Sequence, residues 1–85
     1  MSNYKEIELM FGNLLSQPAS NLSNAEIEEV REFLDAGEYG IALRTFVAIF
    51  GEEYKIPTPA EFDIVKQLAL AMCIDPDTLL AKMTR

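Results

Sequence analysis

Apolar residues in this chain recur at spacings of three and four residues in several separate blocks. This is the period of a helix that buries one side. In the first block the recurring residues are Ile7, Met10, Phe11 and Leu14. They predict a helix over about residues 3–15, which the proline after Gln17 and a stretch rich in serine and asparagine separate from the next block.

A capping box predicts the start of the second helix. The hydroxyl of Ser23 can accept a hydrogen bond from the backbone of Glu26, while the Glu26 carboxylate can accept one from the Ser23 amide. The predicted helix spans residues 24–36 and buries Ile27, Val30, Phe33 and Leu34. At about 100° per residue, the opposite side carries Glu28, Glu29, Glu32 and Asp35.

Gly37 is placed to end this helix, because a residue just past a helix end often takes a positive φ, which glycine adopts at little cost. The next block is apolar on nearly every side and predicts a central helix over residues 39–51, with Gly51 at its end. So short a turn predicts a hairpin of the second and third helices, with Gly40 allowing their backbones to approach closely.

Two cap-and-proline signals follow. Thr58 with Glu61 forms a second capping box, with proline at the first helical position, and Asp75 precedes another proline. No pattern predicts a strand hairpin. The chain is therefore expected to be an all-α, small single-domain bundle over residues 1–85, with four to five helices at about 3–15, 24–36, 39–51, 59–72 and 76–83.

The net charge of the chain indicates which classes of partner to expect. The 85 residues include 14 acidic and 7 basic side chains, for a net charge of -7, which repels phosphate backbones and favours basic partners over nucleic acid. No apolar run has the length of a membrane-spanning helix, and the N-terminus lacks the pattern of a signal peptide. We expect a cytoplasmic protein that has no membrane partner.

The residue types needed for most site chemistry are missing. The sequence contains no histidine and one cysteine, which excludes an intrachain disulfide, a zinc cluster and a Cys-His nucleophile. Cys73 is expected to serve packing. Calcium-loop and phosphate-loop patterns do not occur, and most carboxylates fall on exposed helix sides. We expect no catalytic residue, metal, cofactor or small-molecule substrate, and therefore no enzyme.

The acidic stripe of the second helix is the most distinctive surface feature. Residues 26–38 hold six acids against Arg31 alone. Two interpretations stay open: an ordinary solvated surface, or a partner-binding surface. Tyr39 is either an anchor of that interface or a half-buried structural tyrosine with its hydroxyl satisfied. The candidate partner-binding residues are Glu28, Glu29, Glu32, Asp35, Glu38 and Tyr39.

Three sequence patterns carry a family resemblance. They are V-x-x-F-L-x-x-G-E-Y-G-x-A-L from Val30 to Leu43, I-P-x-P-x-E from Ile56 to Glu61, and L-x-x-x-M-x-I-D from Leu68 to Asp75. Over about residues 24–80 the chain resembles the MafI-type immunity proteins of bacterial polymorphic toxin systems, which are similar to contact-dependent growth inhibition immunity proteins. The match is carried mainly by Gly37, Glu38, Tyr39, Gly40, Ala42 and Leu43.

The resemblance implies a small cytoplasmic inhibitor whose partner is the C-terminal domain of a cognate toxin. Nuclease toxins are usually basic because they bind phosphates, so an acidic inhibitor fits such a partner. The alternative is a helical adaptor or regulatory subunit that binds another cellular protein through an apolar groove, using exposed residues such as Leu70 or Leu79. Association with a basic toxin would weaken in high salt, whereas adaptor binding would not.

Overall fold

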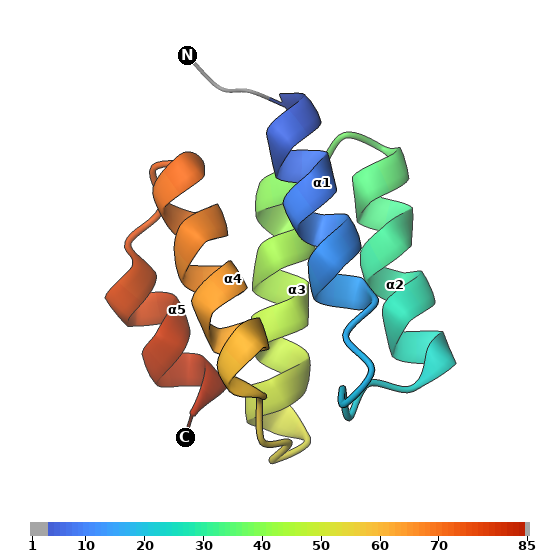
Figure 1. The fold of residues 1–85 in the computed structure, drawn as a ribbon, viewed down its shortest axis with the longest axis vertical. Coiled ribbons are helices and arrows are strands. Elements are labelled where there is room, and N and C mark those ends of the chain that lie inside the picture. The colour runs from blue at the N-terminus through green and yellow to red at the C-terminus, as the bar shows by residue number, and fades with distance from the viewer. Residues whose placement is uncertain (1–3, 85) are drawn as a thin grey trace.

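The computed structural model describes residues 4–84, and this part of the chain contains five helices and no strand. The helices are α1 (Tyr4–Leu15), α2 (Asn24–Asp35), α3 (Tyr39–Glu52), α4 (Pro59–Ala71) and α5 (Pro76–Met83) (Figure 1). The all-α prediction is confirmed, and every described helix end lies within one residue of its expected position. Residue 3, where the first helix was expected to start, lies outside the described residues.

Local capping explains where three of these helices begin. In both predicted capping boxes the two hydrogen bonds are present, at Ser23 with Glu26 and at Thr58 with Glu61. The side chain of Asp75 caps α5 by accepting from the backbone of Asp77 at 3.1 Å. These bonds satisfy amide groups that have no partner inside the helix.

The helices α2, α3 and α4 end alike. The residue after each C-cap has a positive φ: 76° at Gly37, 53° at Tyr54 and 58° at Cys73. The amide of the next residue then donates to a carbonyl five positions earlier, as Lys55 does to Phe50 at 3.0 Å. Glycine adopts this backbone conformation readily, but it occupies only the first of the three positions.

Two predictions about single residues near helix ends are wrong. Gly51 does not end α3, because it is buried within the last turn and Tyr54 takes the left-handed position instead. Cys73 does not serve packing, because its side chain is exposed just beyond the end of α4.

The central position of α3 and its hairpin with α2 are confirmed. α3 packs against α2, α4 and α5, while α1 packs against α4 (Figure 1). The rings of Phe46 and Phe50 lie in the core with centroids 4.9 Å apart. Gly40 does not mark a close approach of two backbones, because an added Cβ would meet only the side chain of Arg44, at 3.5 Å.

One charged side chain among the described residues is fully buried. Glu61 accepts from the Thr58 amide at 2.9 Å through Oε1, while its Oε2 has no hydrogen-bond partner in the described part of the chain. The capping bond explains why a glutamate stands at this position, but a buried carboxylate oxygen without a partner costs free energy.

Candidate partner-binding surface

The outer side of α2 carries the predicted acidic stripe. Its four carboxylates are all exposed, and none has a hydrogen-bond or ion-pair partner within residues 4–84. The side chain of Val30, on the inner side, is fully buried, as the helical period requires. The structure thus brings together Glu28, Glu29, Glu32 and Asp35 on one helix, and we call these four residues the acidic stripe.

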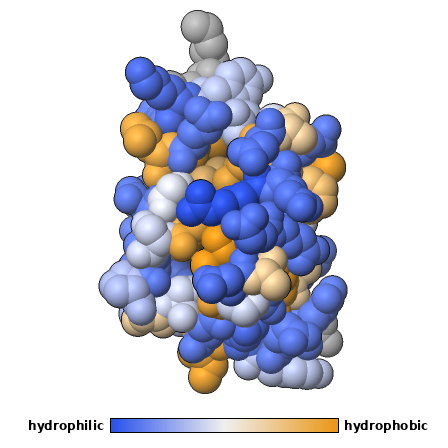
Figure 2. Space-filling model, turned by 90° about the vertical axis from the view of Figure 1, so that its right-hand side faces the viewer, coloured by the Kyte–Doolittle hydropathy of each residue, from blue (hydrophilic) through white to orange (hydrophobic). Residues whose placement is uncertain are grey.

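Hydrophilic residues dominate this side of the molecule. Figure 2 shows the side on which α2 lies in Figure 1, with hydrophobic residues visible mainly in a small central area, at the two edges of the upper half and at the lower end. Because unpaired carboxylates of one sign create a local negative potential, this surface attracts cationic groups.

The last two candidate residues lie at the corner between α2 and α3. Glu38 is the exposed N-cap of α3 and makes no capping bond with its side chain. Tyr39 is half-buried, and its hydroxyl donates to Oε2 of Glu8 on α1 at 2.7 Å. Its ring stacks on Tyr4 with centroids 5.6 Å apart.

Tyr39 therefore belongs to the contact between α3 and α1. The hydrogen bond to Glu8 raises the pKa of the Tyr39 phenol, because the carboxylate favours the protonated hydroxyl. These surroundings match the structural interpretation of Tyr39, whose hydroxyl is satisfied. Its assignment to a partner surface stays a prediction.

An open depression of about 260 Å³ lies beside this corner. Its lining is mainly apolar and consists of Tyr4, Ile7, Gly37, Tyr39, Gly40, Met72 and Ile74. Among the described residues of that lining, tyrosine phenols are the only titratable side chains, and the buried Glu61 is not part of it. No carboxylate, cysteine or cationic side chain from residues 4–84 therefore lines the depression.

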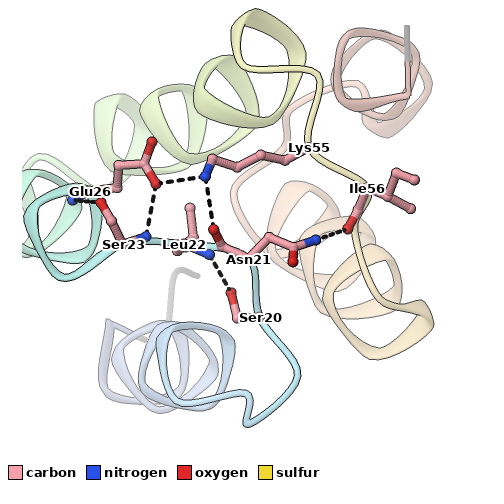
Figure 3. A network of polar contacts seen from close by, with 7 residues as sticks. All are labelled: Ser20, Asn21, Leu22, Ser23, Glu26, Lys55 and Ile56. Carbon is pink, nitrogen blue, oxygen red and sulfur yellow. Dashed lines mark hydrogen bonds and ion pairs between the residues drawn. The ribbon is translucent and has the colours of Figure 1, made fainter.

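At the opposite end, a polar network joins two loops that are distant in sequence (Figure 3). The ammonium group of Lys55 contacts Oε1 of Glu26 at 3.2 Å and donates to the carbonyl of Asn21 at 2.8 Å. The side-chain amide of Asn21 donates to the carbonyl of Ile56 at 2.9 Å. We call these contacts the loop clasp, because they fasten the connection before α2 to the connection after α3.

Glu26 has two local roles in this clasp. Its Oε1 accepts from the Ser23 amide at 2.9 Å and also contacts Lys55. The bond from Ser23, together with the nearby ammonium of Lys55, lowers the pKa of the Glu26 carboxyl. Glu26 thus differs from the acidic stripe, whose carboxylates serve no such contact.

Comparison with known proteins leaves the family open. No family model, no curated protein and no solved structure matches this chain. Within residues 4–84, no group of three or more metal-binding side chains is arranged to hold an ion. The helices of that same part of the chain are all too short or too polar to cross a membrane. The resemblance to immunity proteins remains a prediction from sequence patterns.

Some residues of this surface were not expected from the sequence. Asn21, Lys55 and Glu8 make contacts with residues 31 to 35 positions away. The exposure of Tyr54 and Ile56, at 75% and 77%, was also not expected, although Ile56 begins one of the patterns that carry the family resemblance. The two could have been noticed as large apolar residues in a short connector with no helical period to bury them.

Proposed function

We propose that this protein is a cytoplasmic immunity protein that binds and neutralises a cognate bacterial toxin domain, using the acidic stripe. The observation that carries the proposal is the group of four exposed carboxylates on one side of α2, each unpaired within residues 4–84. A basic partner would supply the missing charges, and the family resemblance suggests that this partner is a toxin.

The stripe does little for the helix that carries it. Asp35 is the last residue of α2, whose last turn has no basic residue. A negative charge at this end is unfavourable, because it lies close to the negative end of the helix dipole. Glu26 completes the capping box and Val30 packs in the core, so neither the cap nor the core depends on the four residues of the stripe. A role in binding accounts for acids that the fold does not need.

The expected target is a toxin surface that binds phosphate groups. Such a surface is basic, so the stripe can cover it in place of a nucleic-acid backbone. Opposite charge also speeds capture, toward about 10⁸ M⁻¹s⁻¹ at low ionic strength. Fast capture suits an inhibitor that must act before the toxin reaches its substrate.

The test is co-expression with the toxin C-terminal domain encoded beside this chain, followed by measurement of the dissociation constant with a catalytically inactive form of that domain. We expect rescue of cell growth and a complex that weakens at high salt. Replacing both Glu32 and Asp35 with lysine should weaken binding by several kcal/mol if the two carboxylates are desolvated in the complex.

A matched control separates local charge from net charge. Asp63 is an exposed acid on α4, a helix that does not pack against α2. We expect the single variant Asp63→Lys to leave affinity nearly unchanged, while Glu32→Lys weakens it. Equal effects of the two variants would show that only overall charge matters, and would remove the stripe from the interface.

The adaptor alternative makes a different prediction for the same assay. It requires exposed apolar residues, and Leu70 is 59% exposed, but Leu79 is only 4% exposed and belongs to the core. The expectation that Leu79 is available to a partner is therefore wrong. Binding that survives high salt and is lost in Leu70→Ala would favour the adaptor over the immunity protein.

A further inference from the structure

Tyr54 combines an unfavourable backbone with an exposed side chain. Its φ of 53° lies in the left-handed region, which costs a non-glycine residue free energy. Its side chain is 75% exposed, so packing within this chain does not compensate. The fold alone would favour glycine at this position, as at Gly37 after α2.

The neighbouring residues hold Tyr54 in a defined place. The backbone of Lys55 donates to Phe50, and its side chain is fixed by the loop clasp. The carbonyl of Ile56 accepts from Asn21, while its side chain points away from the clasp in Figure 3 and is 77% exposed. Two large apolar side chains are thus presented to solvent from a fastened loop.

The position of this loop relates it to the acidic stripe. The ion pair between Lys55 and Glu26 joins the loop to the first turn of α2. Just before the loop, Glu52 and Glu53 are exposed and have no hydrogen-bond or ion-pair partner within the described residues. An apolar pair bordered by acids matches a pocket that is apolar inside and basic at its edge.

We propose that Tyr54 and Ile56 are the apolar anchors of the toxin interface and insert into an apolar pocket of the basic partner. This inference rests on the proposed function and adds the contacts that would supply most of the binding energy. Buried aromatic anchors commonly dominate interfaces, while charged residues around them set specificity and rate. The stripe would then orient the partner, and the loop would hold it.

The experiment measures thermal stability and the dissociation constant for the inactive toxin domain in parallel. Tyr54→Gly should raise the melting temperature, because it relieves the strained backbone, and should weaken binding about tenfold or more. Ile56→Ala should weaken binding without changing the melting temperature. Because Tyr54→Gly is expected to fold more stably, its loss of affinity could not be attributed to unfolding.

Two controls match these variants. Cys73→Gly changes the other non-glycine residue with a positive φ within residues 4–84, so it should raise the melting temperature and leave affinity unchanged. Leu70→Ala removes an exposed apolar side chain elsewhere and should also leave affinity unchanged. Together they separate the effect of helix-end strain, and of apolar exposure in general, from the effect of this loop.

The outcomes distinguish the two proposals. If Glu32→Lys weakens binding while Tyr54→Gly and Ile56→Ala do not, the anchor inference is overturned and the proposed function stands. If the unaltered protein does not bind the toxin domain, both are overturned. Weakening by the loop variants and not by the controls would support the anchors.

Discussion

Helices α2 and α3 form one hairpin, yet they are held in place by different means. α3 has no side-chain cap at its N-terminus, and its burial extends along its length, at Ala42, Leu43, Phe46, Val47, Ile49, Phe50 and Gly51. α2 has one fully buried residue, Val30, but it has a complete capping box and a glycine at its C-terminal end. Burial therefore stabilises α3, while local end contacts contribute more to α2.

Because of this difference, the residues that the fold requires are concentrated on α3, while the outer side of α2 is available for binding. A helix stabilised by burial tolerates few changes, because most of its sides contact the core. A helix stabilised at its ends and along one stripe leaves the opposite side free to vary. The acidic stripe lies on that free side, so its charges could change to suit a partner without loss of the fold.

The largest expected effect compares the burial of the two helices by the same change, phenylalanine to alanine, in each. Phe46 on α3 is fully buried, and Phe33 on α2 is half-buried. Phe46→Ala should lower the free energy of unfolding by about 3–5 kcal/mol, and Phe33→Ala by roughly half as much or less. Urea denaturation of both variants checks this expectation. Equal losses would mean that α2 is anchored in the core as firmly as α3.

A smaller effect tests the caps. Ser23→Ala removes the hydroxyl that accepts from the Glu26 amide at 3.2 Å, and should cost about 1 kcal/mol. The matched variant is Glu38→Ala at the N-cap of α3, where the side chain makes no capping bond, and it should cost less than about 0.5 kcal/mol. Denaturation curves for the pair would contradict the comparison if the two losses were the same.

The same difference explains how much of the fold could be predicted from sequence. Capping boxes act between residues three positions apart, so the starts of α2 and α4 were found correctly. The end of α3 was predicted one residue too early, because Gly51 gives the local signal of a helix end while packing buries it inside the last turn. The left-handed conformation then falls on Tyr54, which carries no sequence signal for it.

The candidate surface also has features that the sequence predicts and features that it does not. Exposure of Glu32 and Asp35 follows from the helical period, and the structure confirms it. The hydroxyl contact of Tyr39 with Glu8 and the loop clasp around Lys55 depend on how distant segments pack, which no local pattern reports. The sequence therefore predicts which charges are exposed, but not the long-range contacts that fix the two ends of the hairpin.

The smallest expected effect concerns pH and the N-terminal end of α2. The bond from the Ser23 amide and the contact with Lys55 favour the ionised Glu26 carboxyl in the folded state, lowering its pKa from the ordinary value of 4.5. A pKa lowered by folding contributes stability above the unfolded value and loses it as pH falls through the folded value. Glu26→Gln keeps an oxygen that can accept from Ser23 but removes the charge.

The difference in free energy of unfolding between the unaltered protein and Glu26→Gln should therefore be largest near neutral pH and shrink below pH 4.5. Denaturation at a series of pH values measures it, with Glu29→Gln as a control, because Glu29 has no partner within residues 4–84. A difference that stays constant as pH falls would mean that the charge of Glu26 adds nothing to its capping bond. The loop clasp would then stabilise this end of α2 through the hydrogen bonds of Asn21 and Lys55 alone.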